Sequence, residues 1–369
     1  MKFVTVSTCG TSILTNRASL ENVRFLRENA NRKDYGQEDF SKISGIIEEK
    51  RSKLLEAPIE EAKTLSAELN GFLNFYNSDI EKAKNDVHYL LHTDSFQGKA
   101  AADLIKEWGE QCGIKMTPVL IPRLNTASIE DFRAGINNLI NWCSSVIPDY
   151  RSDGCRIIFN LVGGFKSLQG YMQTLGMFYA DETVYIFEFG GELLRIPRMP
   201  VDFNAQAKQC VADNLELFRK MAVLGQTFPY ETECKNRIPE TMLNISAGQC
   251  MLSEWGNLIW SGMKPEIYRN GLLPPLSENI RYTDGMKNDI ARFDGEQFRK
   301  LNDKIDELAK FIASGKTLNL NRLDYHSLKH KQEKYPMSNY EFDVWNEEHT
   351  RAFCHEEGNV IVIDGVNTL

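Results

Sequence analysis

The stretch Arg156-Ile157-Ile158-Phe159-Asn160-Leu161-Val162-Gly163-Gly164-Phe165-Lys166-Ser167 decides the fold that we expect. Its first part is mostly apolar, which is typical of a strand covered on both faces of a parallel sheet. The two glycines then allow a tight turn, and a helix is expected from there to about Tyr179. A helix that directly follows a buried strand is the unit from which mainly parallel α/β sheets are built.

The same pattern recurs along the first half of the chain. Strands are expected at residues 3–8, 87–92, 116–121 and 183–189, and a further one at 193–197 follows the turn Gly190-Gly191. Helices are expected at 100–112 and 128–143, the second opened by Ser128 and Asp131 in the manner of a capping box. This alternation predicts a Rossmann-like, doubly wound parallel sheet within residues 1–205. Residues 18–86 are helical and charged, and are either an elaboration of the first crossover or a dimer-facing arm with solvated charges.

The composition is that of a folded, soluble protein with more than one domain. The chain has 369 residues, of which 42% are hydrophobic and 25% are charged. Its net charge of −8 argues against a general nucleic-acid binder, although a small polyanion site on such a protein is not excluded. The eight cysteines show no zinc-type spacing, and the N-terminus reads as a strand. We therefore expect a cytoplasmic protein with reduced cysteines and no membrane segment.

Polar loops follow four of the expected strands. They are residues 9–12, 93–95, 125–126 and 163–167, and the carboxyl ends of parallel strands meet at one edge of a sheet. In the last loop the glycines allow close approach of a ligand, the helix N-terminus favours an anion, and Lys166 and Ser167 add a charge and a hydroxyl. Neither a dinucleotide fingerprint nor a Walker loop is present. The loop is thus either a phosphate or nucleotide site or a plain tight turn.

A family resemblance rests on these loops. The run from Asn160 to Ser167, with Gly170-Tyr171, with residues 185–188 and with the opening residues 7–12, resembles the CRISPR-associated Rossmann-fold (CARF) family of type III CRISPR effectors. The resemblance covers residues 1 to about 205. It implies a homodimer that binds cyclic oligoadenylate as an allosteric activator. The cyclic tetra-adenylate is the form that we expect. It also implies the ligand-binding residues Thr8, Gly10, Thr11, Ser12, Asn125, Thr126, Gly163, Gly164, Lys166 and Ser167.

The second half of the chain is expected to hold the output of this sensor. Residues 206–277 read as a helical spacer, with a break near Pro274-Pro275. A HEPN ribonuclease needs a longer spacing than that of Arg322/His326 or Arg351/His355. Neither an acidic nuclease constellation on strands nor a basic recognition helix stands out. These three common effector types therefore fit poorly.

Residues 278–369 fit a fourth type. A short strand at 280–283, a helix capped by Asp284, a second helix after Asp294-Gly295, and strands near 318–328, 340–345, 351–355 and 359–364 are expected. One strand, two helices and a small antiparallel sheet resemble the RelE family of ribosome-dependent mRNA endonucleases. The resemblance implies a small α+β ribonuclease domain that needs no catalytic cofactor or metal and that acts on mRNA in the ribosome, in contact with ribosomal proteins.

The residues of this region suit the chemistry of such an enzyme. Arg351 can bind a phosphate with two hydrogen bonds, and His355 lies four residues further along the same strand, on the same face. Lys329 and Lys331 lie in the most basic short run, and Glu341 and Asp343 are either a general base or outward carboxylates without a role. Arg351 and His355 are alternatively expected only to pair with carboxylates such as Glu347 or Glu348. Residues 280–369 carry 13 Lys and Arg against 16 Asp and Glu, which predicts weak binding of free RNA.

The sequence thus predicts a type III CRISPR effector in which cyclic oligoadenylate activates an endoribonuclease. Two alternatives stay open. The first is a ring nuclease that degrades the ligand in the sensor cleft with Lys166 or Ser12, and the second is a ligand-responsive regulator without catalytic activity.

Overall fold

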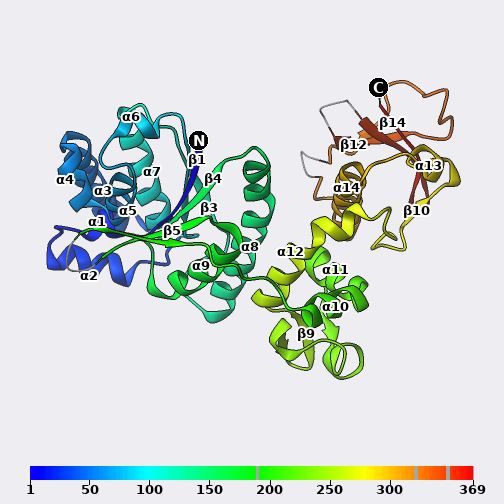
Figure 1. The fold of residues 1–369 in the computed structure, drawn as a ribbon, viewed down its shortest axis with the longest axis horizontal. Helices are drawn as coiled ribbons and strands as arrows, with labels where there is room; N and C mark the ends of the chain where they lie inside the picture. Colours follow the sequence, from blue (N-terminus) through cyan, green and yellow to red (C-terminus); the bar gives the residue numbers. More distant parts are fainter. Residues whose placement is uncertain (188–190, 320–322, 346–349, 369) are drawn as a thin grey trace. The chain divides into compact units, whose positions relative to one another are not determined.

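The structure is a computed structural model that describes residues 1–187, 191–319, 323–345 and 350–368. The chain forms two compact units, Met1–Asp202 and Phe203–Leu369 (Figure 1). The division between the two units, after Asp202, lies near the boundary predicted at residue 205. The boundary predicted at residue 277 falls inside the second unit and stays a prediction. Several predicted features lie outside the described residues, namely the end of the strand predicted at 183–189 and the residues Arg322, Glu347 and Glu348.

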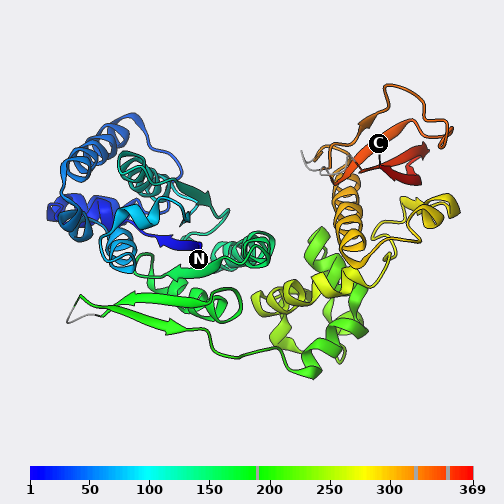
Figure 2. The same cartoon turned by 45° about the horizontal axis from the view of Figure 1, so that its top comes forward.

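The first unit is built on a six-stranded sheet with the order β3-β2-β1-β4-β5-β6. The first five strands are parallel, and β6 runs antiparallel to β5 at the edge of the sheet (Figure 2). The predicted mainly parallel sheet is therefore confirmed. The strands are β1 (Phe3–Cys9), β2 (Val87–His92), β3 (Met116–Leu120), β4 (Arg156–Asn160), β5 (Glu182–Ile186) and β6 (Leu193–Pro197).

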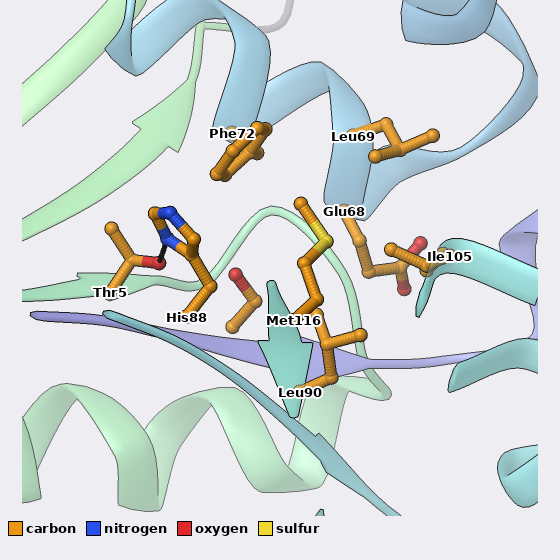
Figure 3. A pocket seen from close by; sticks show the side chains of 9 residues that line it. Thr5, Glu68, Leu69, Phe72, His88, Leu90, Ile105 and Met116 are labelled. Atoms are coloured by element: carbon orange, nitrogen blue, oxygen red, sulfur yellow. Dashed lines mark hydrogen bonds between the residues drawn. The ribbon is translucent and has the colours of Figure 1, made fainter. Parts of the chain in front are cut away.

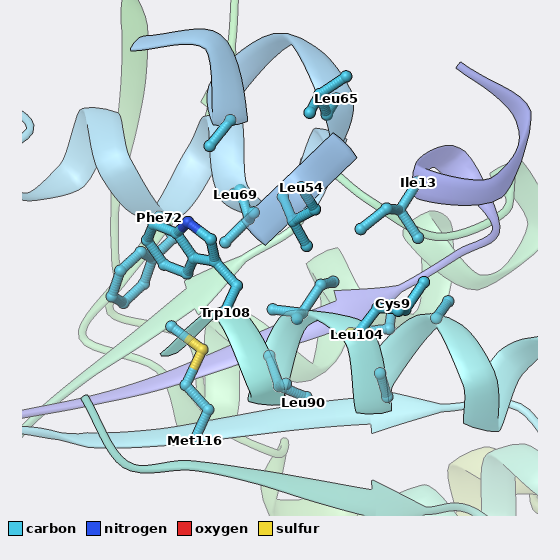
Figure 4. Packing of buried hydrophobic residues seen from close by; sticks show 14 of the residues in the cluster. Cys9, Ile13, Leu54, Leu65, Leu69, Phe72, Leu90, Leu104, Trp108 and Met116 are labelled. Atoms are coloured by element: carbon cyan, nitrogen blue, oxygen red, sulfur yellow. The ribbon is translucent and has the colours of Figure 1, made fainter. Parts of the chain in front are cut away.

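Helices cover both faces of this sheet because its strands are apolar on both sides. On one face, side chains from Cys9, Leu90 and Met116 form a core with the helices of the first half of the unit (Figure 4). On the other face α9 contacts the sheet so closely that a Cβ on Gly176 would lie 2.7 Å from Thr183 Oγ1. The helices are α1 (Ser12–Thr15), α2 (Leu20–Glu28), α3 (Gln37–Glu56), α4 (Ile59–Leu65), α5 (Ala67–Phe75), α6 (Ile80–Ala83), α7 (Phe96–Gln111), α8 (Ile129–Ser152) and α9 (Lys166–Tyr179).

Two of these helices are longer than the sequence patterns predict. Helix α7 begins four residues earlier than predicted, since the Ser95 side chain caps it by accepting from Gly98 N. Helix α8 is capped by Ser128 as predicted, and it continues through Pro148 to Ser152. Asp131 does not complete a capping box there, because its carboxylate pairs with Arg123 at 2.8 Å.

The first part of the second unit is not entirely helical, which corrects the prediction of a helical spacer over residues 206–277. Between helices it contains a three-stranded antiparallel sheet with the order β7-β9-β8. Its strands have only two to four residues, too few to show a clear alternation in the sequence. The elements are α10 (Ala205–Asp213), α11 (Leu215–Leu224), β7 (Phe228–Pro229), η1 (Tyr230–Cys234), η2 (Glu240–Met242), β8 (Leu243–Ser246), β9 (Gln249–Leu252) and α12 (Glu254–Arg269).

The rest of the unit is a five-stranded sheet with the order β10-β14-β13-β12-β11, packed against α14. The sheet is mixed and not purely antiparallel as predicted, because β10 pairs in parallel with β14. Helix α13 is capped by Thr283, not by Asp284, and Asp294 forms a capping box with Gln297 at the start of α14. The elements are β10 (Ile280–Tyr282), α13 (Asp284–Asp289), α14 (Gly295–Ala313), β11 (His326–Ser327), β12 (Tyr340–Trp345), β13 (Thr350–Glu357) and β14 (Val360–Thr368).

The eight cysteines are free thiols, and six of them are buried. Across the described ranges, no helix has both the length and the apolar character that a membrane crossing requires.

Candidate functional site

The loops that follow β1 and β4 meet at the carboxyl edge of the first sheet. These strands are neighbours at the point where the strand order reverses, which is where open α/β sheets form a crevice. The Thr8 hydroxyl donates to the carbonyl of Gly163 at 2.7 Å, and a Cβ on Gly10 would lie 3.0 Å from Gly164 N. The structure therefore brings these four predicted ligand-binding residues together.

Glycine is required at both positions of the β4 loop. Gly164 has a φ of +95°, in the left-handed region that other residues rarely adopt. At Gly163 the limit is space, because a Cβ would lie 2.2 Å from Glu68 Oε1 and 2.6 Å from the carbonyl oxygen of Thr8. The sequence Gly163-Gly164 thus serves the close approach of the two loops, and this holds whether or not a ligand binds.

Glu68 is the main residue of this site that the sequence analysis missed. Its carboxylate accepts hydrogen bonds from Gly10 N and the Ser12 hydroxyl, each at 2.7 Å, and from the Ser66 hydroxyl at 2.6 Å. The side chain is only 1% exposed and points from α5 toward the sheet (Figure 3). The Gly10 N–H and the Ser12 hydroxyl, both predicted to bind ligand, are therefore occupied by a carboxylate of the chain itself.

The other predicted ligand residues divide into two groups. Lys166 and Ser167 are exposed as the first two residues of α9, whose N-cap residue Phe165 makes no side-chain capping bond. The Lys166 ammonium, the Ser167 hydroxyl and the N-terminus of the helix can together bind an anion there. Thr11, in the loop that follows β1, is half-buried. Asn125 and Thr126 instead serve the loop itself. The side-chain Oδ1 of Asn125 accepts from Ala127 N at 2.9 Å, and Thr126 donates to Asn31 Oδ1 at 3.0 Å.

A small cavity lies behind Glu68, between α5 and the sheet (Figure 3). Thr5 and His88 line it, joined by a hydrogen bond of 2.8 Å, and burial lowers the pKa of His88 below its ordinary value. Its volume of about 10 Å³ is that of a single water molecule. The cavity is therefore too small for a nucleotide, and the open edge with Lys166 remains the candidate ligand site.

In the second unit, Arg351 lies in a cluster of charged side chains on one face of the sheet. Its guanidinium hydrogen-bonds Glu341 and lies 3.3 Å from Asp343, both on the neighbouring strand β12. His326, on β11, adds a contact of 3.0 Å from Nε2 to Glu341 Oε1. The sequence analysis named Arg351, Glu341 and Asp343 as catalytic candidates, and named His326 only in the rejected pair with Arg322, because only the strand pairing places it opposite Glu341. We call these four residues the Arg351 cluster.

His355 lies in a second cluster with other carboxylates. Its Nδ1 is 2.9 Å from both oxygens of Asp364, and its Nε2 is 3.2 Å from Glu357 Oε1. Burial alone would lower the pKa of His355, but the hydrogen bonds to Asp364 and Glu357 outweigh it and raise the pKa above its ordinary value. Because only a protonated ring can donate from both nitrogens, this arrangement favours the imidazolium form.

The two clusters share a face of β13 but do not share one site. Alternate residues Ala352 and Cys354 belong to the core, so Arg351, Phe353 and His355 lie on the opposite face, as predicted. Four residues of strand span about 13 Å, and in this structure the two side chains lie in separate ion-pair clusters. Between them the buried Phe353 ring stacks on Tyr335 with 5.0 Å between centroids. In this structure Arg351 and His355 thus bind different carboxylates, and their joint action on one scissile group stays a prediction.

The predicted RNA-binding lysines Lys329 and Lys331 are exposed, between β11 and β12. Lys334, in the same basic run, pairs with Asp289 at 2.7 Å. A larger apolar groove of about 460 Å³ lies elsewhere in the unit, lined by residues such as Leu273, Tyr282 and Phe298. Within the part of the chain that the structure describes, none of the predicted catalytic residues lines this groove.

The raised pKa of His355 predicts a pH dependence of stability. A group whose pKa is higher in the folded state stabilises fully below its ordinary pKa of 6.5 and loses this contribution as the pH rises through the folded value. Unfolding of the second unit, followed by hydrogen exchange of β13 and β14 from about pH 6 to about pH 9, should therefore become easier with rising pH. The variant His355→Gln should show a flatter profile, and equal slopes in both proteins would contradict the assignment.

Within the described residues, no group of three or more His, Cys, Asp or Glu side chains is arranged to hold a metal ion. Residues 63–199 match the model of a protein family described as CRISPR-associated protein (Cas_APE2256). The matched region contains Glu68 and the Gly163–Gly164 loop, and it ends before the second unit. A search of curated proteins gave no match. The comparison supports a CRISPR-associated protein, on the strength of the first unit alone.

Proposed function

We propose, from this match of residues 63–199 to CRISPR-associated proteins, that the protein is a ligand-activated ribonuclease of CRISPR defence. In this proposal the first unit is a CARF-type sensor that forms a homodimer and binds cyclic oligoadenylate. The second unit contains a RelE-like endonuclease that cuts mRNA in the ribosome. Ligand binding shifts the population of the dimer toward the state in which the nuclease is active.

The observation that carries the sensor proposal is the meeting of the β1 and β4 loops where the strand order reverses. The exposed Lys166 and Ser167 at the start of α9 can bind phosphate through a positive charge, a hydroxyl and backbone N–H groups. A cyclic oligoadenylate carries several phosphates on a ring. Two copies of this edge in a homodimer would supply the repeated contacts that such a ligand needs.

The nuclease proposal is supported by the Arg351 cluster. Cleavage through the 2′-hydroxyl requires a base for its proton, a cation for the phosphate and an acid for the leaving oxygen. The Glu341 side chain is 7% exposed and can accept the proton, while Arg351, whose side chain is 29% exposed, can bind the phosphate through its guanidinium. His326 contacts the same carboxylate and is suited to protonate the 5′ oxygen. In this arrangement RNA must take Arg351 from its ion pairs, and Lys329 and Lys331 bind the RNA backbone.

The decisive experiment maps cleavage on a translating mRNA by toeprinting, with purified protein and with cyclic tetra-adenylate, cyclic hexa-adenylate or no ligand. We expect ligand-dependent cuts only at codons that a ribosome occupies, and none on the same RNA without ribosomes. Absence of cuts with either ligand would remove the RelE-like assignment. Measuring the amount of intact ligand in the same reactions tests the alternative activity, degradation of the ring in the cleft.

A further inference from the structure

The Glu68 carboxylate occupies an anion site that the chain builds at the carboxyl edge of its first sheet. It receives hydrogen bonds from Gly10 N, from the Ser12 hydroxyl and from the Ser66 hydroxyl, over distances of 2.6 to 2.7 Å. As the second residue of α5, it also lies at the positive end of a helix. A buried carboxylate is costly unless such donors satisfy it, so its presence at 1% exposure implies a specific role for the arrangement.

Both loops of the crevice are built around this one side chain. The β1 loop is held directly, through Gly10 and Ser12, and the Ser12 hydroxyl in turn accepts from Ala67 N at 3.0 Å. The β4 loop is held by contact, since Gly163 leaves no room for a Cβ beside Glu68 Oε1. The backbone carbonyl of Glu68 also accepts from Asn160 Nδ2 at 3.0 Å, at the end of β4. Removing the carboxylate would leave three donors without their acceptor.

Two roles are compatible with an anion at this place, and they predict opposite results. If Glu68 competed with a ligand phosphate for Gly10 N–H, its removal would strengthen ligand binding. If it fixes the loops, its removal would weaken binding, because the loops would lose the geometry in which they meet the ligand. The burial favours the second role, since Gly163 lies against the carboxylate, which is only 1% exposed, and a phosphate cannot reach it while the loops stay in place.

We propose that Glu68 is a positioning residue that holds the Gly10–Ser12 loop and the Gly163–Gly164 loop in the geometry that receives the ligand. Its role in binding rests on the proposed function of the first unit as a cyclic oligoadenylate sensor. It also couples the ligand edge to α5, whose N-terminus carries the carboxylate and its Ser66 partner. In this proposal the ligand contacts the exposed groups of Lys166 and Ser167. Glu68 does not contact the ligand and acts only by fixing the positions of the two loops.

The test uses the full chain and two readouts. Hydrogen exchange without ligand measures the protection of peptides that cover residues 9–12 and 163–167, and calorimetric titration measures the affinity for cyclic tetra- and hexa-adenylate. In Glu68→Ala we expect faster exchange in both peptides and affinity lower by about tenfold or more. In Glu68→Gln the amide oxygen can still accept from Gly10 N–H, so both values should lie between those of Glu68→Ala and the wild type. If Glu68→Ala does not fold, the Glu68→Gln variant carries the comparison.

Glu182→Ala provides the matched control. This carboxylate is also buried, at 6% exposure, but it lies at the start of β5 and is paired with Arg156 and Arg195. In the Glu182→Ala protein we expect the hydrogen-exchange rates of the two loop peptides and the ligand affinity to equal those of the wild type. Unchanged exchange in Glu68→Ala, or affinity equal to or tighter than the wild type, would overturn the proposal. If the wild type binds neither ligand, the proposed function fails, and the positioning role is then decided by the exchange data alone.

Discussion

Replacing Arg351 by alanine is expected to reduce ligand-dependent mRNA cleavage by about 100- to 1000-fold, the usual cost of losing one group that stabilises charge in a transition state. In the Arg351 cluster, this guanidinium is the cation positioned beside both Glu341 and Asp343, and its planar fork suits a phosphate. The measurement is the rate of cutting at one ribosome-occupied codon with saturating cyclic oligoadenylate.

Arg281→Ala is the matched control for this variant. Arg281 is also an ion-paired arginine on the same sheet, bound to Glu357, but its side chain is 56% exposed and it does not belong to the cluster. Its loss should change the cleavage rate by no more than about threefold, in keeping with the small contribution of exposed pairs. Because Arg351→Ala leaves two carboxylates side by side, its unfolding must be measured as well. A stable Arg351→Ala protein that cuts at the wild-type rate would remove Arg351 from the mechanism.

Replacing Asp306 by alanine is expected to destabilise the second unit by about 3–5 kcal/mol, the range measured when one partner of a buried ion pair is removed. Asp306 on α14 pairs with Arg219 on α11 at 2.7 Å, and both side chains are 4% exposed. Arg219 also hydrogen-bonds the carbonyl of Pro274, and the hydroxyl of the fully buried Tyr268 donates to Asp306. Without Asp306 the guanidinium would keep its charge inside the protein without a counterion.

The measurement is hydrogen exchange of α11, α12 and α14 in the full chain, with the peptides of the first unit as an internal reference. Asp303→Ala, on the same helix, is the matched variant. Asp303 pairs with Lys264 and Arg299 but is 30% exposed, so its loss should cost less than about 1 kcal/mol. If the two variants cost the same, Arg219 is satisfied by Pro274 or by water, and the buried pair is not a requirement of the fold.

Where local signals were strong, the sequence predicted the elements well. The strands at 87–92 and 340–345 have the predicted bounds, and the β-strand at 156–160 and the helix that ends at Tyr179 follow from an apolar run and its glycine turn. The sheet at 228–252 was not predicted, because its strands are too short to show an alternating pattern and form only through pairing with one another. The parallel pairing of β10 with β14 was missed for a similar reason, because about eighty residues separate them.

The candidate sites show the same division. The loops 9–12 and 163–167 were placed at one edge from the sequence, because the carboxyl ends of parallel strands lie at the same edge of a sheet, whereas Thr8 was implied by the family resemblance. Glu68 was not, since a glutamate in a charged helical segment reads as solvated, and its partners Gly10 and Ser12 lie 58 and 56 residues away. His326 was likewise visible only through its pairing with Glu341 across two strands.

What the sequence by itself determined is the class of the first unit, the edge of the sheet at which its polar loops gather, and the face of β13 that carries Arg351 and His355. These follow from periodicity and from the turn residues, which act over a few positions of the chain. What only the tertiary structure decided is which groups are already bonded. Glu68 takes the donors of the β1 loop, Glu341 and Asp343 bind Arg351, and Asp364 holds His355. The reason is that hydrogen bonds and ion pairs depend on distances of about 3 Å between side chains that are remote in sequence, and only the packed fold sets those distances.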